Sequence, residues 1–112
     1  MERLKKIDLE EYRTKGSKVF TGRERGRQIR EKSQIDTLIN QFSLIEISIP
    51  KDVMSVNPSF LEELLYNIVK ELGYDNFFKR IKFVSESDRY NIEDDLKEAV
   101  DRILRTNNAL SK

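Results

Sequence analysis

The stretch "LIEISIPKDVMSVNPSFLEELL", Leu44–Leu65, contains the clearest strand of the sequence and the start of its most hydrophobic helix. Over Leu44–Ile49, apolar residues alternate with polar ones, as in a strand with one buried face, and Pro50 ends the run. Further on, large apolar residues recur at helical spacings of three and four: Phe60, Leu61, Leu64, Leu65, Ile68, Val69 and Leu72. We therefore predict a strand, a short loop, and a helix that ends at Gly73 and packs on a sheet.

The N-terminal part of the chain contains two shorter candidate strands. Arg3–Leu9 and Ser17–Phe20 flank a turn that ends at Gly16, so we expect a β-hairpin at the start of the sheet. Near the other end, "RIKFV" at Arg80–Val84 alternates in the same way and is predicted to be a further strand. The aromatic cluster before it is interpreted as a lid over the core: Tyr74, Phe77 and Phe78.

Two more segments have helical patterns. The first begins at Thr21, which has capping-box spacing to Glu24, and it carries an apolar stripe: Ile35, Leu38, Ile39 and Phe42. Ile29 lies about 120° off this stripe, so we expect two short helices, with Ser33 and Asp36 available to cap the second. The last helix is capped by Asn91 and has acids in its first turn, where the helix dipole favours them: Glu93, Asp94 and Asp95.

The order of these elements predicts an α/β fold. Strand–helix–strand units imply right-handed crossovers and a mostly parallel sheet. We expect a mixed sheet of about four strands that begins with the hairpin, and about three packed helices. The 112 residues fit one domain, which we place at residues 1–106, followed by a frayed tail at 107–112.

Histidine and cysteine are both absent from the sequence. A Ser-His-Asp or Cys-His catalytic set is therefore impossible, and a zinc site is not expected. We accordingly expect a non-catalytic protein with neither metal nor cofactor. The lack of cysteine gives no sign of secretion, no apolar run approaches the roughly 18 residues of a membrane span, and the start does not resemble a signal peptide. We expect a cytoplasmic protein with no membrane partner.

Charge is distributed unevenly along the chain. Residues 1–32 carry a net charge of +5 and residues 33–112 a net charge of −4, which leaves +1 overall. Such a molecule can bind an acidic partner at one end and a basic partner at the other. It lacks the strong basic excess expected of a dedicated nucleic-acid-binding protein.

Three stretches together resemble a known family: "VFTGRERGRQI" at Val19–Ile29, Leu44–Leu65 quoted above, and "RIKFVSES" at Arg80–Ser87. They resemble the STAS-like domain family, which is akin to the anti-sigma factor antagonists, and the likeness spans most of residues 17–104. The resemblance implies a STAS-like fold. In true antagonists, a partner serine kinase of the histidine-kinase-like ATPase type phosphorylates a serine at the start of the helix after the central strand, and this switches partner binding.

The resemblance implies that Ser59 is the phosphoacceptor, with Ser55 as a second candidate, and that the partner is such an ATPase. Two positions depart from the family pattern. Asn57-Pro58 replaces the acidic residue that usually precedes the serine, and Ser48 stands where family members often have Asp.

The residues themselves leave two interpretations of Ser59 open. Asn57 with Pro58 makes a good helix start, and Ser59 with Glu62 has the spacing of a capping box. In the structural interpretation, Ser59 is only a cap or first-turn residue. In the functional one, Asn57 caps the helix and the Ser59 hydroxyl is available for phosphorylation, favoured by the helix dipole but opposed by the neighbouring acids. The partner-binding surface then comprises Asn57, Pro58, Ser59, Glu62 and Glu63.

A second candidate site is the arginine segment, with Arg23, Arg25, Arg27 and Arg30 within eight residues. On a helix, Arg23, Arg27 and Arg30 share one face, from which guanidinium groups can bind phosphate or carboxylate. Gly26 lies among them and can let a sheet or partner approach closely. The alternative is a solvated basic face paired with neighbouring acids.

These observations favour a regulatory protein–protein interaction domain, with phosphorylation of Ser59 as its candidate switch. One alternative is nucleic-acid or nucleotide binding through Arg23–Arg30. Another is a small inhibitor or adaptor protein of phage or mobile-element origin. Oligomeric state and the identity of the partner do not follow from the sequence.

Overall fold

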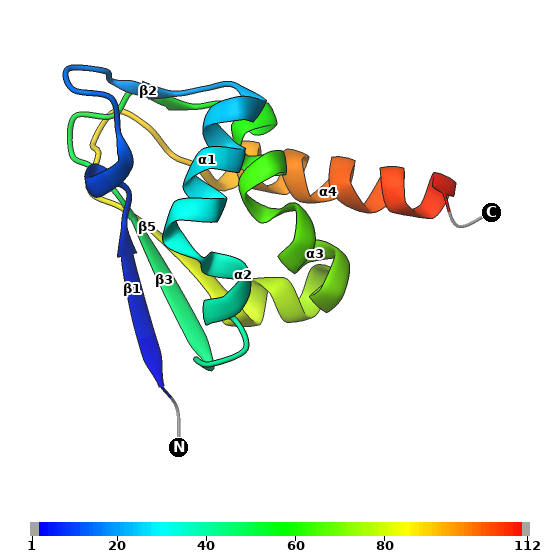
Figure 1. The fold of residues 1–112 in the computed structure, drawn as a ribbon. Coiled ribbons are helices and arrows are strands. Elements are labelled where there is room, and N and C mark those ends of the chain that lie inside the picture. Colours follow the sequence, from blue (N-terminus) through cyan, green and yellow to red (C-terminus); the bar gives the residue numbers. More distant parts are fainter. Residues whose placement is uncertain (1–2, 111–112) are drawn as a thin grey trace.

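The computed structural model describes residues 3–110 as alternating strands and helices (Figure 1). The elements in chain order are β1 (Leu4–Asp8), the 3-10 helix η1 (Leu9–Tyr12), β2 (Val19–Phe20), α1 (Arg23–Ser33), α2 (Ile35–Leu38), β3 (Leu44–Ile49), β4 (Ser55–Val56), α3 (Pro58–Arg80), β5 (Ile81–Ser85) and α4 (Glu93–Leu110).

The strands form two small parallel sheets instead of one sheet of about four strands. The larger sheet has the order β1-β3-β5, with Ile47 of the central strand opposite Ile7 and Phe83. The smaller sheet pairs β2 with β4, with Phe20 opposite Val56. The α/β class and the parallel character are confirmed, while the predicted mixed arrangement is wrong for the described residues, because every strand pair there is parallel.

The predicted N-terminal hairpin is also wrong, because β1 and β2 lie in different sheets. The Asp8 side chain accepts a hydrogen bond from the Glu10 N–H at 3.0 Å and starts η1. Leu9 is fully buried and anchors this turn in the core. The chain therefore leaves the edge of the first sheet, and β2 pairs with the distant β4.

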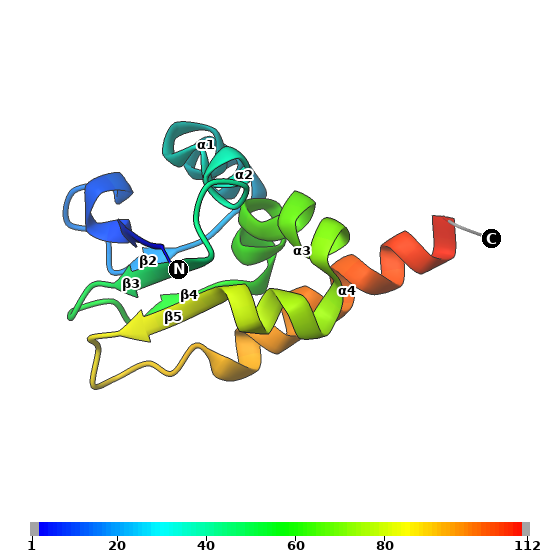
Figure 2. The ribbon, with the colours of Figure 1, turned by 90° about the horizontal axis from the view of Figure 1, so that it is seen from below.

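The helices gather on one side of the larger sheet (Figures 1 and 2). The chain moves from β1 to β3 to β5 in one direction, so two right-handed crossovers place their helices on the same face. That face is packed against the helices and contains a row of buried isoleucines: Ile7, Ile45, Ile47, Ile49 and Ile81. The opposite face leaves Leu4 48% and Val84 41% exposed, although parallel sheets are usually covered on both faces.

The helical segment after β2 divides into two helices, as predicted. Gln34 adopts a left-handed backbone with φ of 56° and separates α1 from α2. The caps expected from Thr21, Ser33 and Asp36 are wrong. Neither α1 nor α2 has a side-chain cap hydrogen bond. Each helix follows a residue with positive φ, Gly22 before α1 and Gln34 before α2, and this residue turns the chain into the helix.

α3 begins as predicted, and its first helical stretch stops at Gly73 as predicted, where the backbone is non-helical with φ of 78°. A second helical stretch, which was not predicted, follows directly and continues the element to Arg80. Burial of Phe77 explains the continuation, because this ring is completely enclosed in the core, while Tyr74 is exposed and Phe78 is partly buried.

α4 has the predicted cap. The Asn91 side-chain oxygen accepts a hydrogen bond from the Glu93 N–H at 2.9 Å. The helix continues to Leu110, into the segment expected to be a tail, and residues 111–112 lie outside the described part. Within residues 3–110, no helix is long and apolar enough to cross a membrane.

Candidate functional site

The two candidate sites identified in the sequence lie against each other. β2 leads into α1 and β4 leads into α3, and the Asn57 N–H donates to the Phe20 carbonyl at 2.8 Å. A Cβ atom at Gly26 would collide with the Phe60 carbonyl oxygen and lie 2.9 Å from the Cβ atom of Glu63. The close approach expected at Gly26 is therefore made by α3, and the arginine segment packs beside the helix that carries Ser59.

Asn57 caps α3 and also holds Ser59. Its side-chain oxygen accepts hydrogen bonds from the Ser59 N–H at 2.9 Å and the Ser59 hydroxyl at 2.8 Å. Its carbonyl oxygen accepts from the N–H groups of Phe60 and Leu61. The Asn57-Pro58 start is thus confirmed and the Ser59–Glu62 capping box is wrong. Ser59 is partly exposed. Its hydroxyl was expected to be available, but it donates a hydrogen bond to the side chain of Asn57.

Ser55 lies elsewhere in this region. It is exposed in β4, opposite Val19 of β2. Because Ser55 belongs to a strand, its own element provides no helix dipole that acts on its hydroxyl. Ser59, by contrast, lies in the first turn of α3, where the helix dipole acts.

Glu62 and Glu63 both form ion pairs with arginines. Arg23 lies 3.5 Å from the carboxylate of Glu62 and 3.8 Å from that of Glu63. Arg102 of α4 lies 3.1 Å from Glu62, and Arg30 lies 3.6 Å from Glu63. Arg30 also donates to the Glu63 carbonyl at 2.6 Å. The two acids of the predicted partner surface therefore hold α1, α3 and α4 together.

The other two arginines of the segment also have partners. Arg27 forms ion pairs with Glu24 and with Glu31, the latter at 3.0 Å, along its own helix. Arg25 donates to the Thr14 hydroxyl. The structure thus agrees with the interpretation of a paired basic face for Arg27.

A different basic cluster lies at the carboxyl edge of the larger sheet, where β1, β3 and β5 all end. The loops that follow these strands surround a pocket of about 560 Å³, which we call the edge pocket. Its lining residues are Arg13, Lys18, Lys51, Asp52, Met54, Asp88 and Arg89. Ligands of parallel α/β sheets commonly bind at this edge.

One ion pair inside the edge pocket is well fixed. Arg13 donates two hydrogen bonds to the Asp52 carboxylate, at 2.7 and 3.2 Å, and also lies 2.6 Å from Glu10. The hydrogen bond from Arg13 holds the pKa of Asp52 below its ordinary value, and the charge of Lys18 lowers it further. The ion pair with Asp52 therefore fixes the orientation of the Arg13 guanidinium at the pocket.

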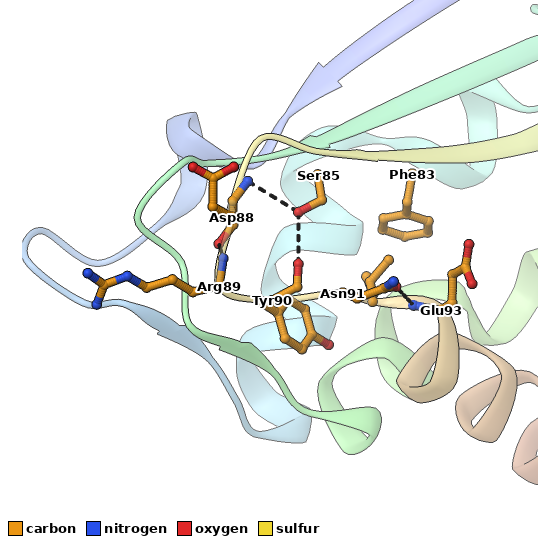
Figure 3. A pocket seen from close by; sticks show the side chains of 9 residues that line it. Phe83, Ser85, Asp88, Arg89, Tyr90, Asn91 and Glu93 are labelled. Carbon is orange, nitrogen blue, oxygen red and sulfur yellow. Dashed lines mark hydrogen bonds between the residues drawn. The ribbon is translucent and has the colours of Figure 1, made fainter.

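The loop between β5 and α4 forms one wall of the edge pocket and is held by its own hydrogen bonds. Figure 3 shows this loop where it lines a second pocket, together with Phe83, Asn91 and Glu93. The Ser87 hydroxyl donates to the Val53 carbonyl at 2.7 Å, and the Ser85 hydroxyl donates to the Tyr90 carbonyl at 3.3 Å. The side chain of Arg89 extends away from Tyr90 (Figure 3). The loop thus presents a guanidinium group on a fixed backbone.

The Tyr90 hydroxyl is the most strongly perturbed titratable group in this region. It lies 2.6 Å from a carboxylate oxygen of Asp95 and 2.9 Å from the Val56 carbonyl. Burial raises the pKa of Tyr90 above its ordinary value, and the hydrogen bond to Asp95 raises it further. This hydroxyl joins the start of α4 to β4.

The edge pocket escaped sequence analysis because its cations come from separate loops. Arg13 and Lys18 precede β2, Lys51 follows β3, and Arg89 follows β5. The sequence contained one sign of this pocket: each of the predicted parallel strands is followed by a polar loop with a basic residue. That signal required the strand order, which the predicted hairpin had obscured.

No cluster of three or more His, Cys, Asp or Glu side chains suited to a metal ion occurs among the described residues. Comparison of the chain with protein-family models, with curated proteins and with solved structures gave no match. The resemblance to the STAS-like family therefore stays a prediction from the sequence.

Proposed function

We propose that the chain is a non-catalytic regulatory domain that binds a protein partner, and that phosphorylation of Ser59 controls this binding. The observation that carries the proposal is the division of roles at the start of α3. Asn57 caps the helix, while Ser59 presents a partly exposed hydroxyl in the first turn. A kinase can therefore modify Ser59 without removing the cap residue.

The charges around Ser59 support this role. A phosphate there faces Glu62, one helical turn away, which alone would disfavour it. In the structure, however, Arg23 and Arg102 already neutralise Glu62. Because Arg102 pairs with Glu62 at 3.1 Å, Arg23 can turn from Glu62 to a neighbouring phosphate; its side chain is 59% exposed and contacts its acids only at 3.5 Å or more. The helix dipole adds to this attraction.

Phosphorylation also has a direct local consequence. The modified oxygen can no longer donate a hydrogen bond to the Asn57 side chain, and the phosphate places negative charge beside that carbonyl oxygen. The surface formed by Asn57, Pro58 and Ser59 therefore changes both in charge and in hydrogen bonding. We propose a serine kinase of the histidine-kinase-like ATPase type as the partner, on the resemblance alone.

The test is recovery of partners from the native cells with the wild-type protein, Ser59→Ala and Ser59→Glu, with Ser55→Ala as the matched control. The proposal expects Ser59→Ala and Ser59→Glu to recover at least one partner in amounts that differ severalfold, and Ser55→Ala to match the wild type. Equal recovery of every partner by all four proteins would remove the proposed switch. Recovery of a foreign enzyme alone would favour the inhibitor alternative.

Binding of nucleic acid or nucleotides by the arginine segment is the second candidate. It is favoured by the start of α1, which has no side-chain cap, and by the exposure of Arg23. It predicts affinity that falls steeply with salt and is lost in an Arg23→Ala/Arg27→Ala double variant. Since these arginines already bind carboxylates, a ligand must displace Glu24, Glu31, Glu62 or Glu63.

A further inference from the structure

The edge pocket contains cations that have no carboxylate partner. Lys18, Lys51 and Arg89 form no ion pair among residues 3–105. No carboxylate oxygen there lies within 4.0 Å of their side-chain nitrogens. This distinguishes the pocket from the arginine segment, where Arg23, Arg27 and Arg30 all have acidic partners. We therefore expect an anion to bind in this pocket more readily than at the arginine segment Arg23–Arg30.

The pocket also has a defined shape and a fixed charge. The Arg13 guanidinium is held by Asp52 and Glu10, so its orientation is set before any ligand arrives. Lys18 is positioned by the backbone, because its carbonyl accepts a hydrogen bond from the Met54 N–H at 2.7 Å. Four basic and two acidic side chains line the pocket, and Glu10 pairs with Arg13 beside them. One positive charge therefore remains in excess, which favours an anion such as a phosphate monoester.

The remaining lining residues narrow the ligand class. Asp88 is exposed and makes no side-chain hydrogen bond within the described part of the chain, so its carboxylate can accept hydrogen bonds from hydroxyl groups. Met54 is 49% exposed and offers an apolar surface beside the cations. The volume of about 560 Å³ lies within the range of roughly 300–1,000 Å³ that is typical of small-molecule sites.

We infer that the edge pocket binds the phosphate ester of a sugar, either free or as part of a nucleotide. Lys18, Lys51 and Arg89 hold the phosphate, Asp88 accepts hydrogen bonds from the sugar hydroxyls, and Met54 covers an apolar face of the ligand. This site does not include Ser59, and its existence does not depend on the proposed switch.

The test is isothermal titration of the full chain with ribose 5-phosphate, AMP, inorganic phosphate and adenosine. The inference expects saturable binding of ribose 5-phosphate or AMP, weaker binding of inorganic phosphate and none of adenosine. Tighter binding of AMP than of ribose 5-phosphate identifies a nucleotide as the ligand, and equal binding identifies a sugar phosphate.

Two double variants with the same change in net charge locate the site. Lys51→Gln/Arg89→Gln should lower the affinity at least tenfold. The control Lys32→Gln/Arg105→Gln alters two exposed cations outside the pocket and should bind within twofold of the wild type. Circular dichroism confirms that both variants fold.

Three results would overturn the inference: no saturable binding of either phosphate ester at millimolar concentration, equal losses in the two double variants, or binding of adenosine as strong as that of AMP. A single-stranded RNA that binds more tightly than AMP, with affinity that falls steeply with salt, would also overturn it, because the surface would then serve nucleic acid.

Discussion

At the scale of single residues, Gly26 shows how closely α1 and α3 approach. In a helix interior, replacing glycine by alanine ordinarily stabilises by up to about 1 kcal/mol. At this position the new Cβ would collide with the Phe60 carbonyl and crowd Glu63. The backbone of α3 cannot move aside easily, because Phe60 itself is fully buried.

We therefore predict that Gly26→Ala destabilises the protein by roughly 1–3 kcal/mol, the usual cost of overpacking. Urea unfolding followed by circular dichroism measures this change. Lys32→Ala is the control, because it places alanine at an exposed position of the same helix and should change the stability by less than about 0.5 kcal/mol. An unchanged or raised unfolding midpoint for Gly26→Ala would show that the two helices are not in contact there.

Asn57 and Ser59 form a second residue-scale pair, in which only Asn57 is the cap. Asn57→Ala should cost about 1 kcal/mol, since it removes the acceptor of the Ser59 N–H. Ser59→Ala should cost less than half as much, because it removes the hydrogen bond from the hydroxyl to Asn57 but leaves the Ser59 N–H capped. Chemical denaturation of the two variants gives the comparison. The reverse order would mean that Ser59 caps the helix and would remove the structural basis of the proposed switch.

At the scale of elements, Arg80 joins the end of α3 to the chain between α2 and β3. Its guanidinium donates to the carbonyls of Ser43 at 2.8 Å, Ile39 at 2.6 Å and Phe42 at 2.9 Å. Ile39 is the C-cap of α2, and Phe42 and Ser43 lie in the loop before β3, so the planar fork of donors satisfies three carbonyl acceptors at once.

Arg80→Met is expected to destabilise by roughly 2 kcal/mol or more, because charge-assisted hydrogen bonds are lost and the carbonyls are left without a donor. Arg80→Lys should recover only part of this, since an ammonium group cannot reproduce the fork. The exposed neighbour provides the control, Lys79→Met. Thermal unfolding of the three variants tests the prediction, and equal stability of Arg80→Met and Lys79→Met would refute it.

The contact between α4 and β4 depends on Tyr90 and gives a prediction for alkaline pH. Burial and Asp95 raise the pKa of Tyr90 in the folded protein, so the unfolded chain loses the phenolic proton first. This group therefore stabilises the fold below pH of about 10, and that contribution falls as the pH rises further, by at most about 1.4 kcal/mol per pH unit.

Urea unfolding at several pH values between 8 and 11 measures this loss. Tyr90→Phe should show a smaller decrease in stability with pH than the wild type. Tyr74→Phe, which removes an exposed hydroxyl, should follow the wild-type curve. If Tyr90→Phe and the wild type lose stability in parallel, Tyr90 does not have the environment described.

For the whole molecule, local periodicity predicted the elements that carry large apolar side chains. The strand Leu44–Ile49, the start of α3 at Asn57-Pro58 and the cap at Asn91 are all confirmed. These features depend on residues close in sequence, where the alternation or spacing of side chains determines the outcome.

The parts that sequence analysis missed depend on contacts between distant residues. β2 lies within the predicted strand Ser17–Phe20, but its partner β4 was missed, because its two residues are too few to show a period and the two strands pair across the chain. The edge pocket likewise combines Arg13, Lys51 and Arg89 from three loops. Such a cluster becomes visible only after the strand order is known, and the order β1-β3-β5 places the three loops at one edge.

The account depends most on Ser59 as a control point of a binding domain. The most direct measurement is mass spectrometry of Ser59 phosphorylation on the native protein from its own cells, after its partner-bound and unbound forms have been separated. The account predicts phosphate at Ser59 and a severalfold difference in its occupancy between the two forms, with Ser55 unmodified or equally modified in both. Absence of phosphate at Ser59, or equal occupancy in the bound and unbound forms, would contradict it.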